Sequence, residues 1–223
     1  MKALLYKEFK LAMHPICYVF IAMFPLLILI PSYPLAIGFI YVLTCYPILF
    51  LGANKGQQSN DLLYSTLLPV RKKDIVLARI MTVAIMQFAF MAIMCALYPL
   101  CRLIEQSISE AATPGLGVNA FVSILAIAIV GYAIADLIFF PIYYKRGKAI
   151  VSSTLFMILG FVIYLGIFTI ALPFIPGCQG YTDVLSGNIG IQFAILAGAL
   201  VFYVLIHIAV YKISSKRLEK VDF

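Results

Sequence analysis

The sequence predicts an all-α integral membrane protein of six transmembrane helices, with both termini in the cytoplasm. The first observation is composition, since 64% of the 223 residues are hydrophobic and only 11% are charged. A soluble domain carries about a quarter charged residues, and even folded proteins expose a large surface that so apolar a chain could not cover. The second observation is a set of long apolar runs, and the third is the placement of the basic residues between them.

Six apolar runs supply the predicted transmembrane helices. A helix needs roughly 20 mostly apolar residues to cross the hydrocarbon core. The runs occupy residues 16–30, 35–53, 75–101, 118–144, 149–175 and 189–211. The first run is short and contains Pro25, which predicts a kink. One such run also fits a buried helix of a soluble protein, but six do not, and we treat residues 1–223 as a single transmembrane domain.

The basic residues predict the topology. Positively charged residues near the ends of spans favour the cytoplasmic side. With the six runs as spans, 14 of the 16 basic residues fall on one side, Arg79 lies just inside the third run on that same side, and Arg102 falls on the other. Residues 31–34, 102–117 and 176–188 are then outside the cell. The charge of +7 also fits a nucleic-acid-binding protein, but because the basic residues alternate with the runs, we expect membrane lipid and no nucleic acid as the partner.

Residues 1–14 predict an amphipathic helix that lies along the inner membrane surface. On a helix the apolar face holds Leu5, Phe9 and Ala12, and the polar face holds Lys7, Lys10 and His14. Such a helix suits the boundary between lipid and water. The alternative is a polar N-terminal tail.

Motifs for catalysis or metal binding are missing from the sequence. It contains no H-E-x-x-H, no G-x-S-x-G and no phosphate-binding G-x-x-x-x-G-K-[ST]. No cysteine pair has the C-x-x-C spacing of a metal site. We therefore predict no catalytic residue and no metal site. Whether Cys101 and Cys178 form a disulfide stays open.

Two ionisable residues fall inside the runs at similar predicted depth. Asp136 interrupts the fourth run and Arg79 lies near the start of the third. A charge at such depth is costly and usually faces the bundle interior with a partner, so we predict that Arg79 and Asp136 form an ion pair. A substrate or proton site at Asp136 is the alternative. His207, late in the last run, is either a proton carrier or a hydrogen-bonded residue at the membrane interface.

Small residues repeat every four positions in the last run, at Gly190, Ala194 and Gly198. Small residues at this spacing let helices approach closely. The pattern fits a contact within the chain or one between two subunits.

The connection between the second and third runs is the longest cytoplasmic one and is not a plain solvated loop. Asn60 or Asp61 can cap a short amphipathic helix, and Pro69 ends it. A helix with exposed leucines is suited to docking on another protein, although it could also pack on the bilayer surface. The residues that we assign to docking are Asp61, Leu62, Leu63, Tyr64, Leu67, Leu68, Pro69, Arg71, Lys72 and Lys73.

Two strings in the sequence resemble ABC type-2 exporter permeases. The string LLYSTLLPVRKKDIVLAR looks like the segment before the third span of those proteins, and the basic start MKALLYKEFK and the six-span layout are similar too. The chain most resembles small bacterial permeases grouped with exporters of amphipathic peptides such as the phenol-soluble modulins. It departs from some relatives in its brief outer connections, which leave no room for a large extracellular domain.

The resemblance implies a multi-pass subunit in a bacterial cell membrane that has no ATPase site of its own and binds no cofactor. Such permeases pair as two subunits, the same or different, and sit on separate ABC ATPase subunits that hold ATP and Mg. Residues 57–74 would then be the segment that couples the permease to the ATPase. Because the runs carry almost no fixed charge, we expect a hydrophobic or amphipathic substrate, such as a peptide, to leave the cell. The alternatives are an ion-gradient-driven secondary transporter and a membrane-embedded enzyme.

Overall fold

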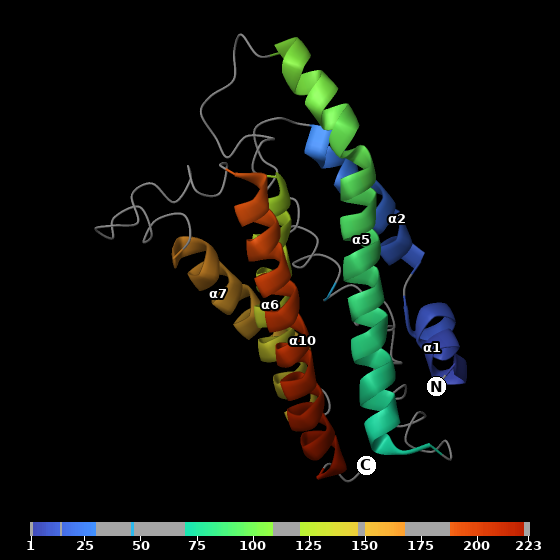
Figure 1. The fold of residues 1–223 in the computed structure, drawn as a ribbon. Helices are drawn as coiled ribbons and strands as arrows, with labels where there is room; N and C mark the ends of the chain where they lie inside the picture. Colours follow the sequence, from blue (N-terminus) through green and yellow to red (C-terminus); the bar gives the residue numbers. More distant parts are fainter. Residues whose placement is uncertain are drawn as a thin grey trace.

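The computed structural model describes residues 2–13, 15–29, 46, 70–108, 121–146, 150–167 and 188–220. Within these ranges every regular element is a helix. The long helices are α5 (Lys72–Ile108), α6 (Phe121–Arg146) and α10 (Ile189–Glu219), and the shorter helix α7 (Ile150–Gly166) packs on α6. Figure 1 shows α5 and α10 running in opposite directions, with α6 behind α10.

The N-terminal part bends sharply before it enters the bundle. It consists of α1 (Lys2–Lys7), a π-helical turn η1 (Glu8–Ala12), α2 (Pro15–Met23) and a 3-10 helix η2 (Phe24–Leu29). The axis of residues 2–10 and that of residues 15–26 differ by 83°. Pro25 explains the change from α2 to η2, because proline lacks the N–H of an α-helical hydrogen bond and its ring clashes with the preceding turn. The kink predicted for the first run is this change of helix type.

Three described helices are long and apolar enough to cross a membrane, namely α5, α6 and α10. A fourth candidate arises if the bent N-terminal pair counts as one span, and the apolar part of α7, Ile150–Tyr164, is shorter than the others. The predicted second run, 35–53, lies outside the described residues except for Tyr46. The all-helical membrane fold is therefore confirmed for the described part of the chain, whereas six spans and the cytoplasmic termini stay predictions.

The bundle has an aromatic interior and an apolar exterior. Phe90, Phe139, Phe140 and Tyr144 are fully buried among α5, α6 and their neighbours. In contrast, large apolar side chains point outward from α7 and α10, such as Val151, which is 70% exposed, and Leu205, which is 60% exposed. An apolar surface of this extent is unfavourable in water and favourable in lipid.

Several basic segments meet at one end of the bundle. Figure 1 shows α1, the start of α5 and the end of α10 at this end. Lys73 of α5 lies 3.3 Å from Glu219 of α10, and Arg217 of α10 donates a hydrogen bond to the carbonyl oxygen of Pro141 on α6. We call this end the basal end.

Candidate functional site

A buried ion pair joins the N-terminal segment to α5 at the basal end. Arg79 donates from Nε to Oε2 of Glu8 at 2.9 Å and from Nη2 to Oε1 at 3.2 Å. Arg79 is 2% exposed and Glu8 is 4% exposed. Arg79 also donates from Nη1 to the hydroxyl of Tyr143 on α6 at 3.2 Å. We call this group the basal cluster, and it consists of Glu8, Arg79, Tyr143 and Lys7. The two N–H groups of the planar Arg79 guanidinium match the two oxygens of the Glu8 carboxylate.

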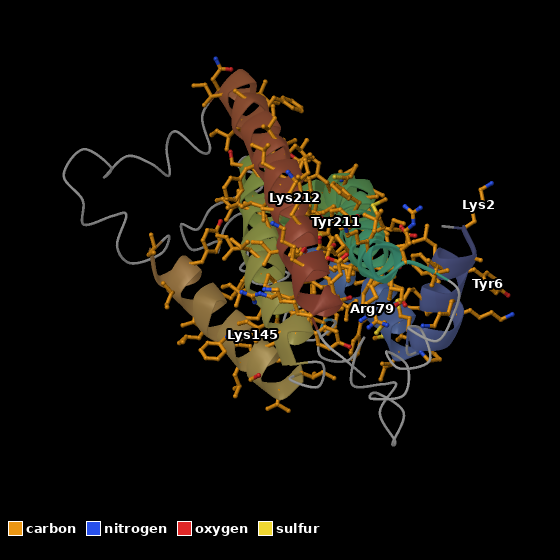
Figure 2. All side chains as sticks on the ribbon, turned by 90° about the horizontal axis from the view of Figure 1, so that it is seen from below. Lys2, Tyr6, Arg79, Lys145, Tyr211 and Lys212 are labelled. Carbon is orange, nitrogen blue, oxygen red and sulfur yellow. The ribbon has the colours of Figure 1, made fainter. Side chains whose placement is uncertain are left out.

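The basal cluster changes the interpretation of the N-terminal helix. The sequence places Lys7 on the polar face, but the structure buries it with its Nζ 3.7 Å from Oε1 of Glu8. That prediction is wrong for Lys7, because the Glu8 carboxylate lies between two cations and offsets the cost of burying them. Lys10 is exposed as predicted. Figure 2 shows Arg79 between α5 and the N-terminal helices, whereas Lys2 and Tyr6 point away from the bundle.

A second polar group lies deeper in the bundle, around Asp136 of α6. Gln87 of α5 donates from Nε2 to Oδ2 of Asp136 at 3.2 Å and to the hydroxyl of Tyr46 at 3.0 Å. Tyr203 of α10 donates its hydroxyl to Oε1 of Gln87 at 2.6 Å. Nε2 of His207, also on α10, lies 2.9 Å from Oδ2 of Asp136. These five residues form the central cluster.

The predicted ion pair between Arg79 and Asp136 is not formed. Arg79 binds Glu8 and Tyr143, while Asp136 contacts Gln87 and His207. Tyr143, which marks the depth of Arg79, is seven residues after Asp136 on α6, or about 10 Å of helix. The prediction is wrong because it estimated the depth of each residue from the sequence and did not consider Glu8 as a partner. The bend before α2 places the Glu8 carboxylate next to Arg79.

His207 lies beside Asp136, is partly buried and is hydrogen-bonded, as one of its two predicted alternatives requires. Its Nδ1 lies 2.9 Å from the backbone carbonyl oxygen of Tyr203, and its ring stacks on the Tyr203 ring with centroids 3.9 Å apart. Asp136 is fully buried, and its Oδ1 atom has no hydrogen-bond partner within the described part of the chain. The central cluster therefore combines a carboxylate, an imidazole and an unused acceptor atom.

An apolar cavity of about 540 Å³ lies between α5 and α10, reaches this cluster and opens to the surface, where Phe88 and Val204 of its walls are 44% and 56% exposed. Its walls include Ala84 and Phe88 of α5 and Tyr203, His207 and Tyr211 of α10. Ligand cavities for small molecules are typically of this size and are mostly apolar with a few polar groups. His207 touches both the cavity and Asp136, so it separates the buried carboxylate from the cavity.

The stripe of small residues on α10 does not mediate a close contact among the described residues. Gly190, Ala194 and Gly198 are exposed, and no described atom lies within 4 Å of where a Cβ on Gly198 would be. The close approach occurs instead at Gly160 of α7, where a Cβ would clash with Cδ1 of Ile138 on α6.

The docking residues of the sequence fall mostly outside the described part of the chain. Asp61, Leu62, Leu63, Tyr64, Leu67, Leu68 and Pro69 lie there. Arg71, Lys72 and Lys73 stand at the start of α5, where the backbone N–H of Asp74 donates to the carbonyl oxygen of Arg71 at 2.9 Å. The predicted alternative of a disulfide between Cys101 and Cys178 also concerns side chains outside the described ones, whereas Cys95 is a free thiol.

Long apolar helices, a lipid-suited exterior and buried polar clusters together define an α-helical membrane protein. A family model described as "ABC-2 family transporter protein" matches residues 3–218. The chain belongs to this family and is an ABC transporter permease, as its sequence predicts. Neither the curated proteins nor the solved structures give a significant match to the chain.

Proposed function

We propose that this chain is the permease subunit of an ABC exporter that moves a hydrophobic or amphipathic substrate, such as a peptide, out of a bacterial cell. The observation that carries the proposal is the family match over residues 3–218. The chain is a transport subunit without an ATPase site of its own and binds no cofactor. ATP and Mg are held by a separate ABC ATPase.

The basal end is the side that meets the ATPase. It gathers Lys72, Lys73, Lys212, Lys216 and Arg217 from the start of α5 and the end of α10, as expected for a cytoplasmic face. Residues 57–74 lead directly into α5 and form the coupling segment. The bend of 83° before α2 suits an N-terminal helix that lies along the inner surface while α2 enters the membrane.

A second permease subunit, identical or different, completes the transporter. The exposed small-residue stripe of α10 supports this, because it allows another helix to approach closely. The apolar outward side chains around it, such as Phe193 and Val201, supply the van der Waals surface on which helix association in lipid depends.

Co-purification tests the proposal. The affinity-tagged chain should bring down a protein with a phosphate-binding G-x-x-x-x-G-K-[ST] motif, and membrane vesicles should then take up amphipathic peptides with ATP. The double variant Leu63→Asp with Leu67→Asp should abolish both results without preventing membrane insertion. The reason is that burying two aspartate charges in the partner, in place of two leucines, is unfavourable. Leu103→Asp is the matched control, since Leu103 is exposed at the opposite end of α5. Normal ATPase binding by the double variant would contradict the coupling role, and movement of hydrophilic solutes alone would contradict the substrate class.

An ion-driven transporter is the second candidate. The buried Asp136–His207 pair favours it, because ionisable residues inside membranes often mark ion or proton pathways. Transport that follows an ion gradient, without ATP and without a bound ATPase, would support this candidate against the first.

A further inference from the structure

The Asp136–His207 pair must hold one exchangeable proton. Nδ1 of His207 faces the carbonyl oxygen of Tyr203, and because a carbonyl oxygen can only accept, we assign a proton to Nδ1. Nε2 of His207 and Oδ2 of Asp136 lie 2.9 Å apart. Both atoms are acceptors when unprotonated, so their close approach requires a second proton on one of them, although the angle of the contact is not that of a hydrogen bond. The pair is then neutral as a whole, and it becomes negative when that proton leaves.

Among the residues that the structure describes, no fixed charge on the helices around the pair replaces this proton. The titratable groups around the pair are the phenols of Tyr46 and Tyr203 and that of Tyr132, one turn away on α6, and phenols are uncharged at neutral pH. α5 contributes the uncharged amide of Gln87. Arg79 is bound to Glu8 in the basal cluster. A deprotonated pair would therefore be an unbalanced negative charge in an apolar bundle, which is unfavourable unless a cation takes the place of the proton.

The cavity beside the pair is suited to binding such a cation. Phe88, Tyr203 and Tyr211 contribute aromatic rings to its walls, and Figure 2 shows Tyr211 on the side of α10 that faces α5. The electron-rich faces of such rings attract cations, most strongly when water is excluded. The remaining walls are apolar except for His207, and Oδ1 of Asp136 behind His207 is an acceptor that no described residue uses.

We propose that the cavity between α5 and α10 binds hydrophobic cations, whose positive charge replaces the proton shared by Asp136 and His207. On binding, that proton leaves to the solvent and the imidazole becomes neutral. His207 then no longer holds the carboxylate in an ion pair, and Asp136 compensates the charge of the ligand. The binding of cations needs no ATPase. Only the further step, that such cations are a transported substrate class, rests on the proposed function.

Binding of radiolabelled tetraphenylphosphonium to the purified full chain in lipid nanodiscs tests the proposal. Tetraphenylborate is the control ligand, because it has nearly the same size and the opposite charge. The phosphonium ion should bind saturably and the borate ion should not compete for the site. The affinity should rise with pH by up to about tenfold per pH unit, because the cation and one proton compete. Asp136→Asn should lower the affinity by at least about tenfold and remove the pH dependence.

Ala84→Trp fills the cavity while leaving all five residues of the central cluster in place, and it should also abolish binding. Val151→Trp, at an exposed position of α7, is the matched control and should bind normally. The proposal is overturned if Ala84→Trp or Asp136→Asn binds the cation like the unaltered chain. It is equally overturned if both ions bind alike, which would identify a site for lipid chains or other apolar molecules. Loss of cation binding while the ATPase still co-purifies refutes this site alone, whereas cation binding without an ATPase refutes the proposed function alone.

Discussion

Replacing Glu8 with glutamine should destabilise the protein by about 3 kcal/mol. The change leaves two buried cations, Arg79 and Lys7, without the carboxylate that now lies 2.9 and 3.7 Å from them. Removing one partner of a buried ion pair costs about 3–5 kcal/mol, because the other charge stays buried and unpaired. Glutamine keeps an oxygen acceptor for one of the two hydrogen bonds from Arg79, so we expect the lower end of that range.

The measurement is a set of double-mutant cycles by thermal unfolding in detergent. Arg79→Met combined with Glu8→Gln should cost less than the sum of the single changes, with a coupling of about 1–3 kcal/mol. Arg79→Met combined with Asp136→Asn is the matched comparison. It should be additive within about 0.5 kcal/mol, because the hydrogen bonds and ion pairs described above join Arg79 and Asp136 to different residues. Additive losses for Arg79 with Glu8, or strong coupling between Arg79 and Asp136, would refute the pairing described here.

Three further changes test other parts of the structure. Tyr203→Phe should cost about 1–2 kcal/mol in unfolding free energy, because it removes the 2.6 Å hydrogen bond to Gln87; an unchanged stability would argue against the central cluster. Gly160→Leu should destabilise the chain by about 1–3 kcal/mol, because its side chain meets Ile138, whereas Gly198→Leu should keep stability and reduce cross-linking between subunits. An unchanged cross-linking yield would move the subunit contact off this face of α10. Lys148→Cys should react with an impermeant maleimide from the cytoplasmic side, and reaction from outside the cell would overturn the predicted topology.

The helices were predictable because burial in lipid needs only a long apolar run, which is a local property of the sequence. The extra length of α10 beyond residue 211 was harder to predict. Its last two turns carry Lys212, Lys216 and Arg217, which an apolar run excludes, yet a helix continues into water where tertiary contacts such as that from Arg217 to Pro141 hold it.

The polar partners were predictable only in kind. Sequence reasoning singled out Asp136, Arg79 and His207 as polar residues within apolar runs, and all three lie in the two clusters. Which one meets which depends on helix rotation and on the bend before α2, neither of which the spacing along the chain encodes. Glu8 could have been found from one signal, since it is an acid in a basic N-terminal segment whose neighbours are apolar or cationic.

The contacts at the basal end decide how a push on the coupling segment would spread. The exposed pair of Lys73 and Glu219 links α5 to α10, but an exposed ion pair contributes only about 0–1 kcal/mol and adds little stiffness. The basal cluster, in contrast, is buried and links the N-terminal segment and α6 to the second turn of α5. Under the proposed function, a displacement of residues 57–74 by the ATPase would therefore move α5, the N-terminal helix and the lower part of α6 together. The cavity follows α5 from Leu77 to Phe88, beside Arg79 and beyond it, so the same motion would change the distance between α5 and α10 where we place the cation.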